Sequence, residues 1–150
     1  MKLDLLQFAA RLKVYLVEGR QTYFDHSRQI YIAITPEEMV RQALMLWLHE
    51  VHNIPWMLLR TEYTVKIGRS NYRIDLVVFN RKANPAMIIE TKAPSVPLTA
   101  QTALQASIYN SVIFAPLLMI ANGSEALYYE IDFENKIPKL LFEFPELNLL

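Results

Sequence analysis

The chain has 150 residues, of which 15 are Lys or Arg and 15 are Asp or Glu, so its formal net charge at pH 7 is zero. Such a length is typical of one domain with its own core, and a hydrophobic content of 53% excludes a disordered chain. The absence of cysteine excludes a disulfide framework, a zinc–thiolate site and a thiol nucleophile, and it fits a reducing compartment, so we expect a cytoplasmic protein.

Residues 1–34 have no clear pattern, and we treat them as an N-terminal extension: residues 3–12 fit a short helix, and residues 14–24 fit a small hairpin. A strong helix signal follows, because Thr35 can cap, Pro36 suits the first helical position and Glu38 stands where a capping box has its acid. The helix should end near Asn53. Its predicted buried stripe is Val40, Ala43, Leu44, Trp47 and Val51.

Three strand-like segments come next, at residues 59–67, 72–80 and 86–92. A helix is predicted over residues 99–115, with Ala103, Ile108, Val112 and Tyr109 facing inward. Further strands are predicted at 117–121, 126–132 and 137–144. This order predicts an α/β fold with a mixed central sheet flanked by helices. We expect a single domain over 1–150, with a core at 35–132 and a C-terminal strand and tail at 133–150.

Two acids stand inside otherwise apolar strands, at Asp75 and Glu90. Buried carboxylates are costly unless they are paired or bound to a metal. Residues two apart on a strand share a face, which places Lys92 beside Glu90. Oxygen-only ligands of this kind suit Mg²⁺, and the chemistry indicated is phosphodiester hydrolysis. The competing interpretation is an Asp–Lys–Glu ion-pair network without a metal.

These residues resemble the PD-(D/E)XK nuclease motif, with Ile74-Asp75 in place of Pro-Asp and Glu90-Thr91-Lys92 as the second half. The segment Gln105–Tyr109 is similar to the Gln-x-x-x-Tyr element of some of these nucleases. With Thr35–Gln42 and Ala121–Gly123, the likeness extends to the N-terminal nuclease domain of type I restriction enzyme R subunits, roughly over residues 23–132.

The resemblance implies a restriction-endonuclease-like core and a Mg²⁺-dependent DNA endonuclease, with Mn²⁺ as a substitute. It implies that Asp75, Glu90 and the main-chain carbonyl of Thr91 hold the metal, and that Lys92 positions the attacking water. It further implies that Gln105 reaches toward the active site or the DNA and that Tyr109 supports it.

Other charged residues keep two interpretations each. Glu38 either completes the metal site, a role Glu37 can also fill, or serves the capping box. Glu62 fits an exposed strand position better than a ligand position. Arg41 and Arg73 either contact DNA phosphates or pair with the acids. Together with Arg69 they are the predicted DNA-binding residues.

The zero net charge conceals an uneven distribution. Residues 60–92 hold seven bases against three acids, whereas residues 93–150 hold two bases against six acids. A basic middle segment that also carries the proposed metal ligands favours contact with DNA phosphates, so neutrality of the whole chain does not exclude nucleic acid.

No Gly-x-x-x-x-Gly-Lys loop is present in these residues, so they contain no ATP-driven motor of the R-subunit type. This leaves open a second hypothesis, a nuclease fold that binds DNA or a restriction-system partner without cutting. A third, a small-molecule enzyme on another α/β fold, has no supporting motif. DNA and other restriction or helicase subunits are the expected partners. The longest apolar run, residues 112–121, is too short for a membrane span, so we expect no membrane partner.

Overall fold

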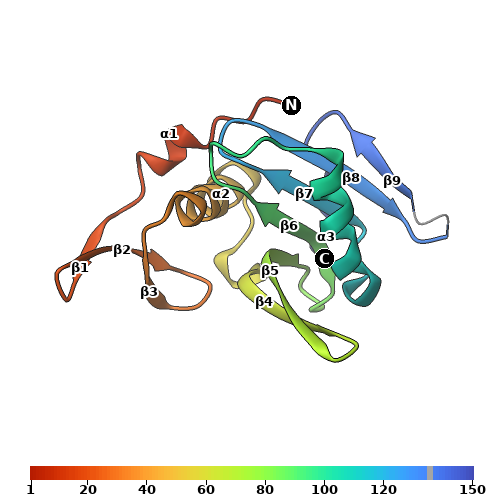
Figure 1. The fold of residues 1–150 in the computed structure, drawn as a ribbon, viewed down its shortest axis with the longest axis horizontal. Helices are drawn as coiled ribbons and strands as arrows, with labels where there is room; N and C mark the ends of the chain where they lie inside the picture. Colours follow the sequence, from red (N-terminus) through yellow and green to blue (C-terminus); the bar gives the residue numbers. More distant parts are fainter. Residues whose placement is uncertain (135–136) are drawn as a thin grey trace.

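A computed structural model describes residues 1–134 and 137–150. The helical elements are α1 (Leu6–Ala9), α2 (Pro36–His52), the 3-10 turn η1 (Trp56–Leu58) and α3 (Ala100–Ile113). The strands are β1 (Tyr15–Val17), β2 (Arg20–Asp25), β3 (Ile30–Ala33), β4 (Leu59–Ile67), β5 (Ser70–Phe79), β6 (Pro85–Thr91), β7 (Leu117–Ala121), β8 (Ala126–Asp132) and β9 (Ile137–Leu141) (Figure 1).

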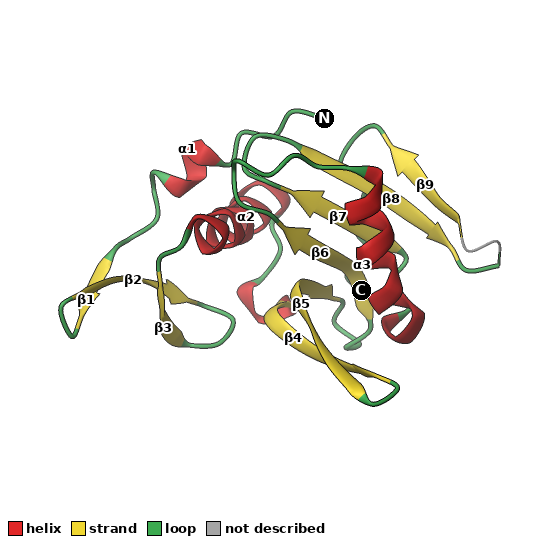
Figure 2. Cartoon of the chain, viewed as in Figure 1, coloured by secondary structure: helices red, strands yellow, loops and turns green. Residues whose placement is uncertain are grey.

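The central sheet has six strands in the order β4-β5-β6-β7-β8-β9. Only β6 and β7 pair in parallel, because α3 connects them as a crossover helix, and every other neighbouring pair is antiparallel. This confirms the predicted α/β fold with a mixed sheet flanked by helices (Figure 2). The β4–β5 hairpin curls away from the rest of the sheet in this view.

The two faces of the sheet carry separate hydrophobic cores. One contains the α2 residues Val40, Leu44 and Leu48 with Leu76 and Ile89 of the sheet. The other lies under α3. Its buried members are Val65, Ile74, Val77, Ile88, Ala106, Ala115 and Leu118. The strands β5, β6 and β7 are therefore covered on both sides, which explains why they read as continuous apolar runs in the sequence.

The N-terminal segment is more ordered than its sequence indicates. It forms a separate antiparallel sheet in the order β1-β2-β3. The sequence predicted a hairpin there but no strand at β3. Leu5 at the start of α1 is fully buried in the α2-side core. Residues 135–136 of the predicted C-terminal strand and tail lie outside the described residues. No helix within the described ranges is long and apolar enough to span a membrane.

Three predicted core positions are wrong. Val51 is 51% exposed, Ile108 54% and Val112 44%. The face of α3 that packs on the sheet is formed by Ala103 and Ala106, which are small enough to let the helix approach closely. The apolar residues of α3 are spread over several sides, so periodicity does not reveal which side is buried, and the prediction of Ile108 and Val112 failed for this reason. Val51 lies in the last turn of α2, beyond the residues of that helix that are buried.

A buried asparagine fixes the loop that follows β6. The Nδ2 of Asn122 donates to the main-chain oxygen of Val96 at 2.8 Å, and its Oδ1 accepts from the main-chain N–H groups of Ser124 and Glu125. Gly123 beside it has a φ of +106°, a conformation in which a side chain would be strained. The turn after β7 thus holds the segment just beyond Lys92.

Replacing Asn122 by alanine is expected to lower the free energy of unfolding by about 1–3 kcal/mol, because the buried Asn122 side chain makes three hydrogen bonds to main-chain groups that are then lost. Denaturant unfolding followed by circular dichroism measures this. Asn148→Ala, which removes an exposed bond to the N–H of Leu150, is the control and should cost less than about 0.5 kcal/mol. Equal losses in the two variants would contradict the assignment.

Candidate functional site

Strand β4 bends at the position opposite Asp75. The register pairs Thr61 with Leu76 and Tyr63 with Ile74, so Glu62 faces Asp75, and Glu62 has a φ of +52°. A non-glycine residue with positive φ inside a strand is strained, and such strain is concentrated at functional sites. The bend also breaks side-chain alternation, because Ile74 joins the α3-side core whereas Leu76 joins the α2-side core.

Asp75 lies at this bend and is held by β6. The Oδ2 of Asp75 accepts from the main-chain N–H of Thr91 at 2.8 Å and from its hydroxyl at 3.1 Å. The N–H and C=O of one strand residue point to the same neighbour, so the Thr91 carbonyl is directed to the Asp75 side as well. The three predicted ligands, Asp75, Glu90 and the Thr91 carbonyl, therefore come from adjoining positions of β5 and β6.

Glu90 is the most perturbed acid of this group. Burial first, and then the charge of Asp75 and a hydrogen bond with it, raise the Glu90 pKa to about 9. Its Oε1 is buried and has no hydrogen-bond partner among the described residues. Burial and the neighbouring carboxylate charge both disfavour the ionised form of Glu90, and a bound cation would favour it. The orphaned oxygen and the oxygen-only donor set both fit a hard divalent cation such as Mg²⁺.

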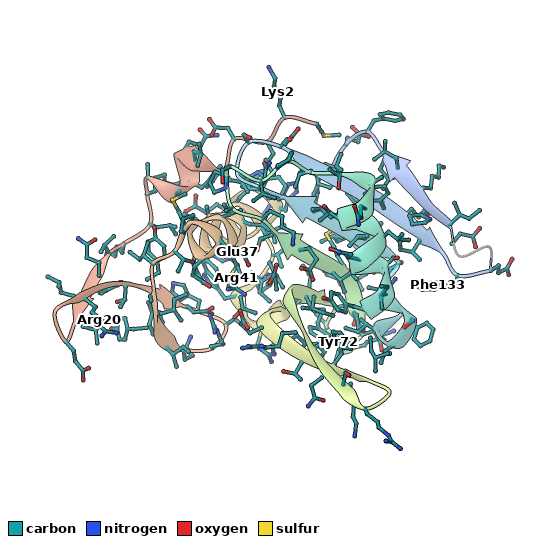
Figure 3. All side chains as sticks on the ribbon, in the orientation of Figure 1. Lys2, Arg20, Glu37, Arg41, Tyr72 and Phe133 are labelled. Carbon is teal, nitrogen blue, oxygen red and sulfur yellow. The ribbon has the colours of Figure 1, made fainter. Side chains whose placement is uncertain are left out.

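Lys92 and Glu37 complete the surroundings of the acid pair. The charge of Lys92 acts on both Glu90 and Glu37. Burial and the charge of Asp75 raise the Glu37 pKa, while Arg41 and Lys92 lower it. Glu37, from the first turn of α2, is thus the first-helix acid on which the charges of Asp75 and Lys92 act. Figure 3 shows Glu37 and Arg41 close together near the middle of the molecule.

Of the two predicted α3 residues, Tyr109 is the one on which the charges of the acid pair act. Burial, followed by the charges of Glu90 and Asp75, raises the Tyr109 pKa. Its ring lies 5.8 Å from that of Tyr72 on β5, centroid to centroid. Gln105 is one turn earlier on α3 and exposed, and no hydrogen bond joins it to the acids within the described ranges. It stands on the solvent side of the site.

Arg41 pairs with acids inside the protein. Its side chain is 7% exposed, and its terminal nitrogens contact Glu38 and, at 2.5 Å, Glu62. A third carboxylate, Asp75, lies 3.8 Å away. Burial by itself lowers the Arg41 pKa, but the neighbouring carboxylates raise it above its usual value. Of the two interpretations left open by the sequence, the structure shows the pairing with acids and places the guanidinium away from solvent.

Glu38 and Glu62 both form ion pairs with Arg41. The hydroxyl of Thr35 accepts the Glu38 N–H at 3.1 Å, so the predicted cap is present, but the Glu38 carboxylate contacts Arg41 and Gln42 rather than completing a capping box. Glu62 is not the exposed residue that the sequence favoured. Its side chain is 23% exposed and also pairs with Arg73 at 3.1 Å.

Sequence reasoning missed Asp25, whose side chain is fully buried at the end of β2. Its Oδ1 accepts two main-chain N–H groups, and its Oδ2 contacts Arg28, Gln42 and Thr61. Burial would raise the Asp25 pKa, but these hydrogen bonds and the Arg28 charge lower it. The only signal in the sequence was an acid ending a short apolar stretch.

These charged groups form one connected cluster with an excess of negative charge. Its carboxylates are Asp25, Glu37, Glu38, Glu62, Asp75 and Glu90, and its cations are Arg28, Arg41, Arg73 and Lys92. When all are ionised the six acids exceed the four cations by two charges, which one divalent cation balances. The described residues contain no group of three or more His, Cys, Asp or Glu side chains that could hold a metal ion.

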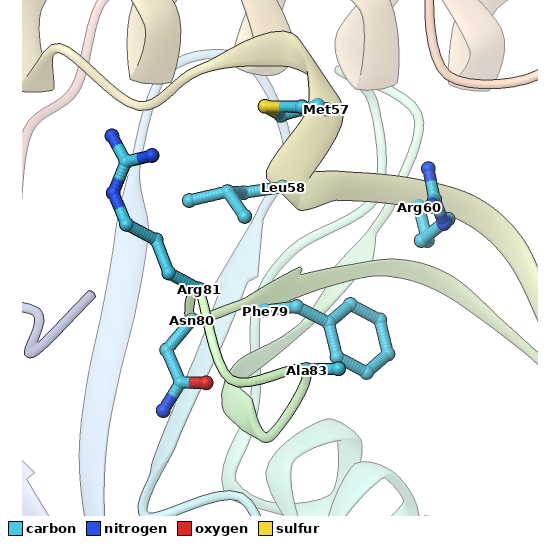
Figure 4. Close-up of a pocket in the computed structure, with 7 residues that line it drawn as sticks. All are labelled: Met57, Leu58, Arg60, Phe79, Asn80, Arg81 and Ala83. Atoms are coloured by element: carbon cyan, nitrogen blue, oxygen red, sulfur yellow. The ribbon is translucent and has the colours of Figure 1, made fainter. Parts of the chain in front are cut away.

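The remaining predicted DNA-binding residues lie on the β4–β5 hairpin. Arg69 is exposed at its turn, and the Arg73 side chain is 72% exposed although it pairs with Glu62. At the other end of the hairpin, a cavity of about 360 Å³ opens between Arg60 and Arg81. Figure 4 shows these two side chains on opposite sides of the cavity, with Phe79 and Met57 between them. The hairpin therefore carries exposed arginines along its length.

Comparison with known proteins gives one family. A sequence model of the family described as type I restriction enzyme R protein N terminus (HSDR_N) matches residues 36–145. The match begins at α2 and includes Asp75, Glu90, Lys92 and α3, but it leaves the N-terminal sheet outside. No curated protein matches the chain.

Proposed function

The chain belongs to the family of type I restriction enzyme R protein N-termini, and on this basis we propose that it is a Mg²⁺-dependent DNA endonuclease domain. The family supports a nuclease-type role in a restriction system. Magnesium dependence and phosphodiester cleavage go further than the family alone and rest on the acid pair. Other subunits of a restriction system are the partners we propose.

The observation that carries the proposal is the Asp75–Glu90 pair. The pair combines a Glu90 pKa of about 9 with a buried Glu90 oxygen that lacks a partner among the described residues. A purely structural ion-pair network would satisfy this oxygen with a cationic side chain. Here Arg41 is anchored by Glu38 and Glu62. Lys92 acts on Glu90 through its charge, but it donates no hydrogen bond to this oxygen.

The proposed mechanism assigns a role to each side chain. Asp75, Glu90 and the Thr91 carbonyl would hold Mg²⁺, which supplies charge stabilisation to the phosphate and lowers the pKa of bound water. Thr91 fixes the orientation of Asp75 through its N–H and hydroxyl. Lys92 would orient the attacking water, and Tyr109 closes the α3 side. DNA cleavage in Mg²⁺ or Mn²⁺ that stops on addition of EDTA tests the proposal.

The alternative is the same fold binding DNA or a partner without cutting. It is favoured by Arg41, which places a cation 3.8 Å from Asp75, where it competes with a metal. The two functions differ in metal uptake. A Mn²⁺ soak that places an ion between Asp75 and Glu90 supports the nuclease, and DNA binding with no ion there supports the binding module.

We propose that DNA lies along the β4–β5 hairpin, whose basic residues contact phosphates. Replacing Arg69 by alanine is expected to weaken DNA binding and to reduce the slope of log K against log salt by about one, since one phosphate contact is lost. Fluorescence anisotropy at several salt concentrations measures both. Arg20→Ala is the matched control, because Arg20 lies on the β1–β2 hairpin, at the left of the view in Figure 3 and away from the β4–β5 hairpin. An unchanged slope in Arg69→Ala would contradict the assignment.

A further inference from the structure

We propose that Asp25 is a positioning residue for the acid site, acting on Arg41 through Gln42 and Glu38. The expected effect on metal binding rests on the proposed function, whereas the expected effect on the position of Arg41 rests on the contacts of Asp25, Gln42 and Glu38. Asp25 belongs to the N-terminal sheet, which lies outside the matched family segment. Its role would make this sheet contribute to the geometry of the acid site.

The first step is the contact between Asp25 and α2. The Nε2 of Gln42 donates to Asp25 Oδ2 and to Glu38 Oε1, at 3.1 Å in both cases, and so it bridges the two carboxylates. All three side chains are buried. Arg28, held by Asp25 at 2.9 Å, also lies 3.7 Å from the same Glu38 oxygen. Asp25 thereby holds both partners of Glu38 Oε1.

The second step is the contact between Glu38 and Arg41. With Oε1 occupied by Gln42 and Arg28, the other Glu38 oxygen is left for Arg41. The Nε of Arg41 is buried and has no partner in the described part of the chain, so the guanidinium is anchored only through its terminal nitrogens. Its position therefore depends on Glu38 and Glu62.

The third step is the distance to the metal ligand. Arg41 is held 3.8 Å from Asp75, which is beyond hydrogen-bonding distance. If the Glu38 anchor is lost, the guanidinium can move closer to Asp75 and turn this 3.8 Å ion pair into a hydrogen-bonded one. That pair would occupy the carboxylate oxygen that a metal needs. The Asp25 side chain thus keeps Asp75 available by keeping Arg41 in place.

The test compares Asp25→Asn and Gln42→Met with wild type in Mn²⁺ binding, measured by electron paramagnetic resonance. Both variants are expected to bind Mn²⁺ about tenfold more weakly, which is the usual effect of losing a group that orients a ligand. Gln42→Met removes only the bridge and covers the case in which Asp25→Asn does not fold. Thr22→Val is the matched control, because it deletes one polar link of the same strand, from Thr22 to the carbonyl of Tyr15.

A second measurement needs no metal. The side-chain NMR signals of Arg41 should shift in both variants, whereas those of Arg11, which pairs with Glu50 elsewhere, should not. Unchanged Mn²⁺ affinity with unmoved Arg41 signals overturns the positioning role, as does an equal loss of Mn²⁺ affinity in Thr22→Val. If wild type binds no Mn²⁺, the proposed function fails, and the Arg41 signals alone decide the positioning role.

Discussion

Replacing Asp75 by asparagine, or Lys92 by alanine, is expected to reduce metal-dependent DNA cleavage by about 10²–10⁴-fold. Asp75 is the carboxylate that Thr91 orients, and its loss removes half of the ionic ligand set. Lys92 acts on the same acid pair through its charge on Glu90. The measurement is the rate of plasmid nicking and linearisation in Mg²⁺, with protein concentration matched and folding checked by circular dichroism.

Lys139→Ala is the matched control for the lysine, because Lys139 is exposed on β9. DNA binding should survive in Asp75→Asn, since the phosphate contacts we propose lie on the β4–β5 hairpin. Cleavage that continues in both site variants at the wild-type rate would show that the chemistry does not use this site. Absence of cleavage in the wild type, with DNA binding retained, would favour the binding module.

Replacing Glu90 by glutamine is expected to stabilise the metal-free protein at alkaline pH and to abolish stabilisation by Mg²⁺. The Glu90 pKa is about 9 in the folded chain, against its usual 4.5. Between these values the folded state binds more protons than the unfolded state, so stability falls as the pH rises through this window. Glutamine removes that dependence, and the metal-free Tm at pH 9 should rise by about 5 °C over wild type.

With Mg²⁺ bound, wild type should become more stable than Glu90→Gln. At a concentration about 100 times Kd, Mg²⁺ adds about 2.7 kcal/mol to wild type at pH 8 and little to Glu90→Gln, which lacks a ligand. The Tm of wild type and of Glu90→Gln is measured by thermal unfolding at pH 6, 8 and 9, once with Mg²⁺ and once with EDTA. Glu130→Gln, an exposed change on β8, should follow wild type. A Tm of Glu90→Gln that still falls with pH as in wild type would show that another group titrates.

Much of the fold follows from local pattern. The alternation of residues 59–67 and the apolar runs at 86–91 and 117–121 identify strands, because side chains of a strand divide between two faces. Thr35 and Pro36 place the start of α2, since the cap and the fixed proline φ are local effects. The parallel pairing of β6 and β7 follows from the length of the crossover that contains α3.

Local pattern did not predict which of several similar helix faces is buried, because tertiary packing determines that. Ile108 and Val112 are exposed because α3 approaches the sheet through alanines, and nothing within the helix distinguishes its apolar sides. It also failed at Glu62, which has a positive φ and whose partly buried side chain pairs with Arg41 and Arg73. These partners are distant in sequence, so their effect is invisible until the chain folds.

By itself, the sequence determined the mixed α/β fold and the strands that carry Asp75, Glu90 and Lys92, and their spacing led to the family. The tertiary structure alone decided how the charges are shared. It buried Arg41 among acids, joined Asp25 of the N-terminal sheet to the site and left Glu90 with an unpaired oxygen. The reason is that ion pairing and burial depend on distances between segments far apart in the chain, whereas helix caps and strand alternation depend on neighbours.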